Sequence, residues 1–170
     1  SFDPNNSRSW SFFTDGVMGG ISSGKAFLGK SGSDNFVRLE GNVSTANNGG
    51  FIQIRHSLAN NLDKDIQGIS LKVRGNGEKY YIFIRTTSTL LPWQFYNASF
   101  ETSKNWNLIK INLEEFQPSS RFLRKTIKSS SIKSIGIVAY GRDHISIVVA
   151  ALPYRNDHQS RQSELSEYSL

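Results

Sequence analysis

The sequence predicts an all-β protein, a jelly-roll-like sandwich of about ten antiparallel strands in two sheets. Three observations support this prediction. Apolar and polar residues alternate with a period of two from about residue 25 to residue 152, as in strands that bury one face. Stretches rich in glycine and asparagine separate these segments, and helical periodicity is almost absent.

The expected strands follow one another with short connections. They are residues 9–14, 25–29, 36–43, 50–58, 68–75, 79–87, 93–101, 106–114, 132–141 and 145–152. The sequence Gly75-Asn76-Gly77 predicts a tight hairpin between two of them, because both residue types accept positive φ at little cost. Residues 141–144 predict another turn, and residues 121–129 are the candidate for one or two helical turns.

Length and composition favour one domain. The chain has 170 residues, enough for a core of its own, and we expect this domain to occupy residues 1–154. The polar tail, residues 155–170, is expected to be flexible. The longest apolar run, residues 145–152, is far shorter than the roughly 18 residues that cross a bilayer.

The residue types exclude some chemistry and favour some partners. There is no cysteine, which excludes disulfides, cysteine-ligated zinc and thiol nucleophiles and fits a reducing, intracellular compartment. The formal net charge is +6, but no common nucleic-acid-binding motif occurs, so no nucleic-acid partner is expected.

Residues 121–133 contain five cations, and no acid occurs between Phe116 and Gly141. This stretch predicts an acidic partner or an anionic membrane surface, and the alternative is an ordinary solvated loop. The cations are Arg121, Arg124, Lys125, Lys128 and Lys133.

A glycine-rich segment, TDGVMGG at residues 14–20, is the most distinctive local feature. A phosphate-binding loop would be followed by a helix, whereas a strand is expected here, so no nucleotide cofactor is predicted. We interpret the segment as a turn in which Asp15 caps the backbone. Its glycines, Gly16, Gly19 and Gly20, are expected to take conformations closed to other residues. The alternative is a partner-binding loop that exposes Met18.

Other candidate residues lie on or beside strands. Residues 79–87 have no polar face before Arg85, so Tyr81, Phe83 and Arg85 are expected to form the floor of a concave surface. Residues 47–51 predict a bend, in which Asn48 is a candidate to bind sugar hydroxyls.

Residues 90–97 place Trp93 and Tyr96 among amides. Such an aromatic platform suits a carbohydrate, but the same rings also suit a core or a protein interface. The expected partner-binding surface combines the glycine-rich segment with the concave floor around Arg55, Arg85 and Tyr96.

Catalytic patterns are weak. The three histidines, His56, His144 and His158, are far apart in the sequence and match no catalytic or metal-binding motif. The acids lie scattered over turns and strand ends, which leaves a pair of glycosidase carboxylates open as an alternative. We therefore expect no catalytic residue, no metal and no cofactor.

Several segments together resemble a known family. Residues 10–24, WSFFTDGVMGGISSG, resemble the opening signature of the complex I intermediate-associated protein family. The similarity continues, in the same order, through residues 47–55, 73–86, 95–102, 106–121 and 132–141. Two departures, Asn76 in place of aspartate and Ala150–Ala151 in place of an acid, weaken any metal or acid chemistry at those points.

The resemblance implies a galactose-binding-like β-sandwich that binds without turnover. Mitochondrial members are assembly factors for NADH:ubiquinone oxidoreductase, so the implied function is a chaperone for a respiratory or photosynthetic membrane complex, with a protein partner. The alternative is a carbohydrate-binding module. The implied compartment is cytoplasmic or organellar, either the mitochondrial matrix or a plastid. The family signature falls on Asp15, Gly16, Met18, Gly19, Gly20, Ser22, Asn48, Gly49, Gly50, Arg55, Arg85 and Trp106.

Overall fold

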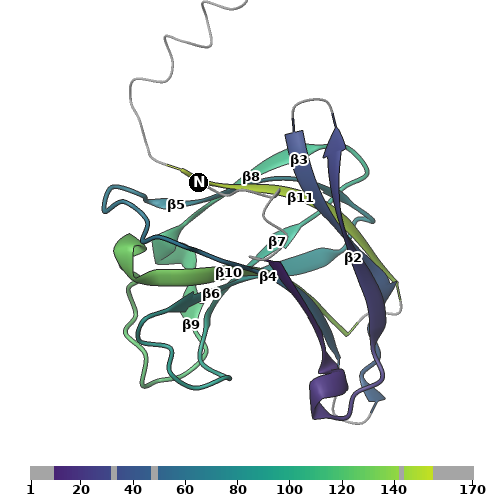
Figure 1. Ribbon diagram of the computed structural model, residues 1–170, viewed down its shortest axis with the longest axis horizontal. Helices are drawn as coiled ribbons and strands as arrows, with labels where there is room; N and C mark the ends of the chain where they lie inside the picture. Colours follow the sequence, from purple (N-terminus) through teal and green to yellow (C-terminus); the bar gives the residue numbers. More distant parts are fainter. Residues whose placement is uncertain (1–9, 32–33, 47–49, 142–143, 155–170) are drawn as a thin grey trace, which may run out of the picture.

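Two antiparallel β-sheets pack face to face in the computed structural model, which describes residues 10–31, 34–46, 50–141 and 144–154 (Figure 1). The six-stranded sheet has the order β1-β4-β10-β6-β7-β9, and the five-stranded sheet has the order β2-β3-β11-β5-β8. The predicted all-β sandwich is therefore confirmed. The tail predicted for residues 155–170 lies outside the described residues.

The strand bounds are close to those predicted. The six-stranded sheet contains β1 (Trp10–Thr14), β4 (Phe51–Ser57), β10 (Ile132–Tyr140), β6 (Lys79–Thr86), β7 (Tyr96–Glu101) and β9 (Gln117–Pro118). The five-stranded sheet contains β2 (Ser23–Ser31), β3 (Asp34–Asn42), β11 (Ile145–Tyr154), β5 (Gly68–Gly75) and β8 (Asn107–Asn112). Short 3₁₀ helices occur at η2 (Asp15–Met18), η4 (Leu113–Glu115) and η5 (Ser129–Ser131). Within the described ranges, no helix has the length and apolarity needed to cross a membrane.

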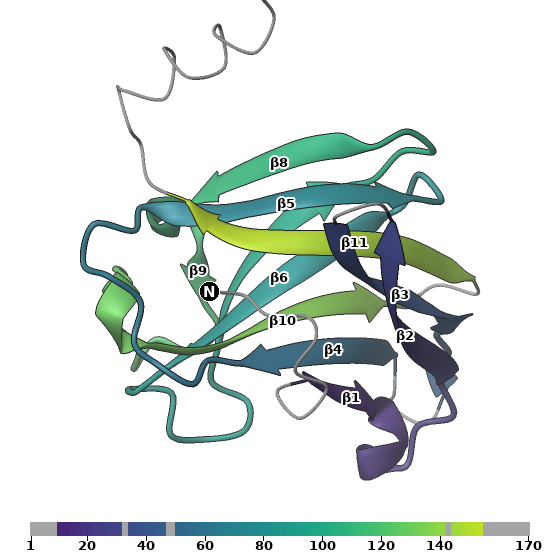
Figure 2. The ribbon, with the colours of Figure 1, turned by 45° about the horizontal axis from the view of Figure 1, so that its top comes forward.

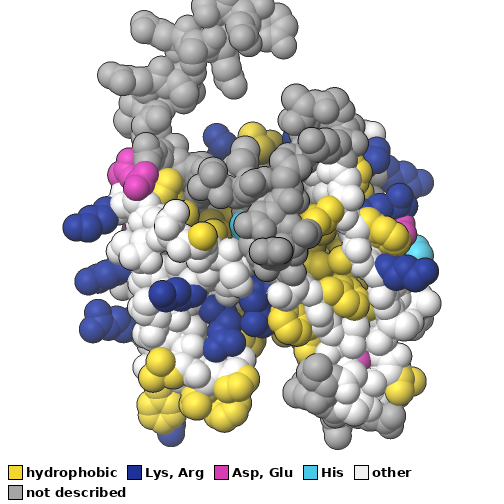
Figure 3. Space-filling view, in the orientation of Figure 1, with side chains coloured by type: hydrophobic (Ala, Val, Ile, Leu, Met, Phe, Trp, Pro, Cys, Tyr) yellow, Lys and Arg dark blue, Asp and Glu magenta, His cyan; other side chains and the backbone are white. Residues whose placement is uncertain are grey.

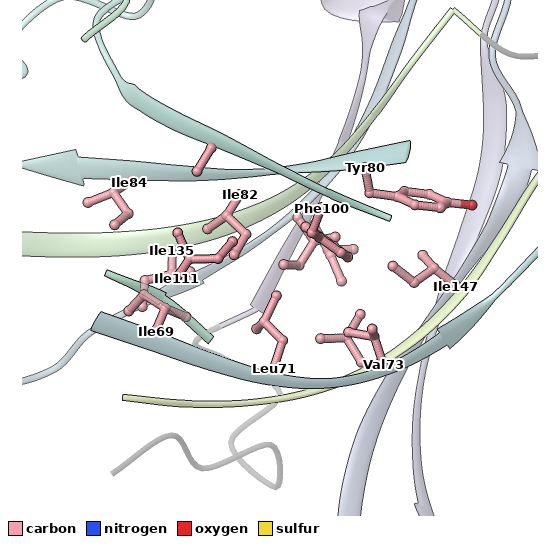
Figure 4. Close-up of a cluster of buried hydrophobic side chains, with 14 of the residues drawn as sticks. Ile69, Leu71, Val73, Tyr80, Ile82, Ile84, Phe100, Ile111, Ile135 and Ile147 are labelled. Atoms are coloured by element: carbon pink, nitrogen blue, oxygen red, sulfur yellow. The ribbon is translucent and has the colours of Figure 1, made fainter. Parts of the chain in front are cut away.

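The core lies between the two sheets, because alternate residues of each strand point inward. In β5 and β6 the inward residues are aliphatic or aromatic and fully buried, and the close-up in Figure 4 shows them pointing toward one another. This packing removes one face of each sheet from water and leaves the opposite face of the six-stranded sheet to form a surface. The inward residues of these two strands are Ile69, Leu71, Val73, Tyr80, Ile82 and Ile84, each 0 % exposed.

The turn at residues 75–77 crosses from one sheet to the other (Figure 2). β5 pairs with β11 and β8, whereas β6 pairs with β10 and β7, so the hairpin predicted here is wrong. Gly77 does have the positive φ, 88°, that the sequence suggested. A positive φ specifies that the chain reverses, but it does not specify the sheet in which the next strand pairs.

Two further predictions differ from the structure. Residues 121–128 form turns, bends and irregular backbone, and η5 begins only at Ser129. Ser120 binds the backbone of Phe122 and Leu123 locally and so competes with a helix. The strand predicted at residues 93–101 begins only at Tyr96, since the side-chain oxygen of Gln94 accepts hydrogen bonds from two loop amides before it.

The hydroxyl of Tyr80 fastens the crossing turn to the start of β11. Tyr80 Oη donates to Asn76 Oδ1 at 2.8 Å and accepts from the Ser146 amide at 3.2 Å. Asn76 Nδ2 in turn donates to the His144 carbonyl at 3.0 Å. A buried hydroxyl thus finds partners in two segments that are far apart in the sequence.

Replacing Tyr80 by Phe is expected to lower the free energy of unfolding by about 1–2 kcal/mol, because the ring stays in the core while Asn76 and Ser146 lose a partner. Urea unfolding followed by circular dichroism measures the change. The slope of the transition should stay the same, since the area exposed on unfolding does not change. An unchanged midpoint would show that the hydroxyl contributes nothing.

Candidate functional site

The carboxylate of Asp15 joins three segments of the chain. Asp15 is 0 % exposed and lies at the start of η2. Its Oδ1 accepts from the Ser22 amide at 3.0 Å, and its Oδ2 accepts from Ser22 Oγ and from the Gly50 amide, both at 2.5 Å. Ser22 Oγ also accepts from the Ser44 amide at 3.0 Å. We call Asp15, Ser22 and Gly50 the carboxylate clasp.

The clasp keeps Asp15 ionised although it is buried. Burial by itself opposes the charged form, but the Ser22 hydroxyl and the amides of Gly50, Ser22 and Phe51 all donate to it. The donors outweigh burial, and the pKa of Asp15 lies below its ordinary value of 3.8. The carboxylate therefore acts as a fixed structural anion that accepts hydrogen bonds.

The glycines of the segment serve this clasp in different ways. Gly19 ends η2 with a φ of 84°, in the left-handed region that favours glycine. Gly20 is needed for space, because a Cβ there would lie 2.2 Å from Asp15 Cγ. The prediction that all three glycines need special backbone conformations is wrong for Gly16 and Gly20, neither of which has a positive φ.

Neighbouring strands of the six-stranded sheet bring polar and aromatic side chains to its outer face. The register places Arg55 of β4, Gly136 of β10 and Phe83 of β6 in one row across the sheet. The adjacent rows contain Gln53, Val138 and Tyr81 on one side, and Ser57, Ser134 and Arg85 on the other. Figure 3 shows the molecule hollowed at its lower edge, between its two projecting ends.

Five aromatic rings form a connected cluster on this outer face. Phe83 stacks on Phe95 with centroids 3.9 Å apart, and Tyr140 makes edge or tilted contacts with Phe51, Tyr81 and Phe83. Tyr140 is 40 % exposed, so part of its ring is open to a ligand. Burial and the neighbouring Tyr81 raise the pKa of Tyr140 to about 12. Its hydroxyl therefore stays protonated at neutral pH and can donate a hydrogen bond.

Arg55 and Arg85 lie beside the aromatic cluster. The Arg55 guanidinium lies 4.7 Å from the centre of the Phe13 ring, and its Nη2 donates to Gln53 Oε1 at 3.4 Å. Within the described part of the chain, its buried Nε has no acceptor. Burial, and then the charge of Arg85, lower the pKa of Arg55. Arg85 Nη2 donates to the carbonyls of Thr89 and Leu91, both at 3.0 Å.

The structure separates several residues that the sequence suggested as one ligand-binding set. Tyr96 is 1 % exposed and belongs to the core, so placing it on the concave floor is wrong. Alternation along β7 puts Tyr96 on the same face as Ala98 and Phe100, which belong to the core. Trp93 is 65 % exposed in the loop before β7, and Trp106 lies against Lys72 and Arg74 of β5. Asn48 lies outside the described residues, and the side chain of Met18 is likewise not described.

Sequence reasoning missed Phe13, Phe51, Gln53 and Tyr140 as members of the outer face. The period-two pattern of β10 contained the signal for Tyr140, since Ile135, Ile137 and Ala139 are buried in the core. The residues between them must then point outward. Among the described residues, no group of three His, Asp or Glu side chains is placed to hold a metal ion.

The chain is thus an antiparallel two-sheet sandwich with aromatic rings and arginines on one outer sheet face. The sequence identifies the family. A family model described as Complex I intermediate-associated protein 30 (CIA30) matches residues 2–150, and the chain belongs to this family. No curated protein is a significant match to the chain.

Solved structures confirm the fold. A family 11 carbohydrate-binding module of the cellulosomal cellulase Lic26A-Cel5E of Clostridium thermocellum has a TM-score of 0.68 at 13 % identity, covering 89 % of this chain and 91 % of that one. The same family 11 module with a β-1,3-1,4-mixed-linked tetrasaccharide has a TM-score of 0.67 at 18 % identity, covering 88 % and 91 %. A family 30 carbohydrate-binding module has a TM-score of 0.57 at 12 % identity, covering 80 % and 77 %.

Replacing Asp15 by Asn should lower the free energy of unfolding at neutral pH by at least about 2 kcal/mol, because an amide cannot accept all the hydrogen bonds that the carboxylate accepts. The folded pKa lies below the unfolded value, so the charged form stabilises the native protein above pH 3.8 and loses this effect as the pH falls through the folded pKa. The difference in free energy of unfolding between wild type and the Asp15→Asn variant should therefore shrink as the pH is lowered.

Urea unfolding at a series of pH values measures this difference. Replacing Glu114, an exposed acid on η4, by Gln is the control and should change stability little. A difference between wild type and the Asp15 variant that stays constant or grows toward low pH would refute the ionised clasp.

Replacing Gly20 by Ala should destabilise the protein more than replacing Gly19 by Ala. The added Cβ at position 20 must displace the buried carboxylate, whereas a Cβ on Gly19 meets no atom within 4 Å and introduces only backbone strain of about 1 kcal/mol. Thermal unfolding of the two variants measures the order. The reverse order would mean that η2 depends on its left-handed end more than on the clasp.

Proposed function

We propose that this protein is a non-catalytic binding module that acts as an assembly factor for a membrane-bound complex of the NADH:ubiquinone oxidoreductase type. Membership of the complex I intermediate-associated family over residues 2–150 is the observation that supports this role most strongly. In this proposal the outer face of the six-stranded sheet binds a segment of a protein partner and holds it during assembly.

The chemistry of the outer face suits a polypeptide with apolar and acceptor groups. The aromatic cluster offers partly exposed rings, and Tyr140 offers a protonated hydroxyl. Arg55 is half-buried on this face, and the accessible part of its guanidinium can donate to a carbonyl or carboxylate of the partner. Aromatic and arginine side chains are the residue types that contribute most to protein interfaces.

The carboxylate clasp has a supporting role in this proposal. β1 pairs with β4 throughout, and the clasp holds the chain just after β1 against the residue just before β4. It therefore fixes the edge of the sheet that carries Arg55 and Phe51. Gly16 and Gly19 are exposed at the end of this edge and would be available to the same partner.

A carbohydrate is the second candidate ligand. One reason is the structural relative that was solved in complex with a tetrasaccharide. Another is the chemistry of the outer face, where aromatic rings can stack on a sugar and guanidinium groups can bind its hydroxyls. Calorimetric titration with β-1,3-1,4-linked oligosaccharides tests this ligand. Binding that is lost when Tyr140 is replaced by Ala would favour the sugar over the polypeptide.

The assembly role predicts that variants of the outer face lose their partner. Replacing Tyr140 by Ala, or Arg55 by Gln, should reduce recovery of assembly intermediates on the affinity-tagged protein about tenfold or more, because both remove groups typical of binding hot spots. Co-purification from membranes followed by quantitative mass spectrometry measures this loss. The same variants should fail to restore complex I activity in a strain that lacks the protein.

The matched control replaces Leu108 by Ala. Leu108 is 63 % exposed on β8 of the other sheet, so this variant should behave as wild type. Normal complex I in the deletion strain would refute the assembly role. Full complementation by both outer-face variants would refute the assignment of the site.

A further inference from the structure

Two loops at one end of the sandwich expose large apolar side chains. Residues 87–95 join β6 to β7, and residues 119–131 join β9 to β10. Leu90 is 82 % exposed, Phe122 is 80 % exposed and Trp93 is 65 % exposed. Figure 3 shows hydrophobic side chains gathered at the lower left of the molecule, where these loops project in Figure 1. We call Leu90, Trp93 and Phe122 the apolar tips.

Hydrogen bonds hold the first loop in this shape. Gln94 Oε1 accepts from the amides of Leu90 and Leu91 at 3.0 and 3.1 Å, so the side chain of Gln94 closes the loop. Arg85 supports it from β6 through the Thr89 and Leu91 carbonyls. Its apolar residues are thus held outward by a defined backbone.

The two loops are also joined to each other. Ser119 Oγ donates to the Trp93 carbonyl at 2.9 Å and accepts from the Phe95 amide at 3.0 Å. The Ser119 amide donates to the Phe95 carbonyl at 2.8 Å. The apolar tips therefore belong to one connected surface, although Trp93 and Phe122 are far apart in the sequence.

The second loop combines its exposed ring with cations. Arg121 lies with its guanidinium 5.2 Å from the centre of the Phe122 ring, and Arg124 and Lys125 follow in the same exposed loop. Neither loop contains an acid, and no acid occurs from residue 117 to residue 141. A surface that combines exposed apolar side chains with cations and contains no acid complements a bilayer with anionic head groups.

We propose that this pair of loops docks the protein on an anionic lipid bilayer. Leu90, Trp93 and Phe122 enter the boundary between head groups and acyl chains, where an indole ring is favoured. Arg121, Arg124 and Lys125 lie at the level of the lipid phosphates. The apolar tips and these cations adjoin the outer face of the six-stranded sheet through Phe95 and Arg85 but are not part of the aromatic cluster. The proposal does not rest on the assembly role.

The shape of the surface favours lipid over a protein partner. A protein hot spot is a ring that fills a well-packed pocket at the centre of an interface, whereas these side chains are highly exposed at loop ends, beside exposed cations. Projecting apolar residues next to lysine and arginine are what interfacial membrane binding requires.

Co-sedimentation of the full chain with vesicles tests this proposal. Vesicles of phosphatidylcholine and phosphatidylglycerol in equal parts should bind the protein, and vesicles of phosphatidylcholine alone should bind it far less. Binding should weaken as salt is added, because the ions screen the cations. Replacing both Arg121 and Arg124 by Ala should lower the partition coefficient about 30-fold, the loss expected for two surface cations.

The apolar contribution is tested by replacing Leu90 and Phe122 by Ser, which should lower partitioning by at least about tenfold. Vesicles should also shift the tryptophan emission to the blue, and this shift should vanish in the Trp93→Phe variant. Two control variants should partition as wild type does. One replaces Leu108 by Ser, and the other replaces Lys104 and Lys110, exposed outside both loops, by Ala. Circular dichroism checks that each variant is folded.

Three outcomes would overturn the proposal. One is the absence of binding to the anionic vesicles, and another is an equal loss in the control and loop variants. The third is full vesicle binding by the loop variants together with loss of a membrane-protein partner, which would assign the loops to a protein interface.

Discussion

The fold depends on one buried anion. Asp15 gathers the start of η2, the residue before β2 and the residue before β4 around a single carboxylate. A carboxylate that is removed from water is tolerated only where donors replace the water, and here amides and a hydroxyl from distant segments do so. The clasp can therefore form only when all three segments are in place, and it fixes β1 as the edge strand beside β4.

The two faces of the six-stranded sheet have separate roles. The inner face is apolar and contributes the packing that stabilises the sandwich. The outer face contains the aromatic cluster and Arg55. Burying part of the Arg55 guanidinium costs free energy, which its contacts with Gln53 and Phe13 offset only in part. Arg85 belongs to this face but is engaged with the loop at residues 87–95. It links the proposed partner-binding face to the proposed membrane-binding loops through one side chain.

Local pattern predicted the strands but neither their arrangement nor the clasp. The sequence predicts that Asp15 caps its own turn, whereas the hydroxyl of Thr14 caps η2 and the carboxylate binds Ser22 and Gly50. Alternation identified β4 and β5, and apolar runs bounded by turn residues identified β6 and β10, which are largely buried on both faces. The Asp-Gly turn followed from residue chemistry. The pattern could not show that β5 and β6 belong to different sheets, since pairing is set by contacts distant in sequence. The polar neighbours of Tyr96 favoured the concave floor, whereas its alternation with Ala98 and Phe100 puts it in the core. Tyr140 and Phe51 meet only across β4 and β10, so their contact required the register.

The central claim is that the outer face of the six-stranded sheet is the surface that recognises a partner. Site-specific photo-crosslinking in the protein's own cells tests it most directly, with benzoylphenylalanine placed at position 140 in one variant and at position 108 in another. The account predicts a covalent adduct with a subunit of the assembling membrane complex from position 140 and none from position 108. An adduct from position 108 alone would contradict it and move the recognition surface to the five-stranded sheet.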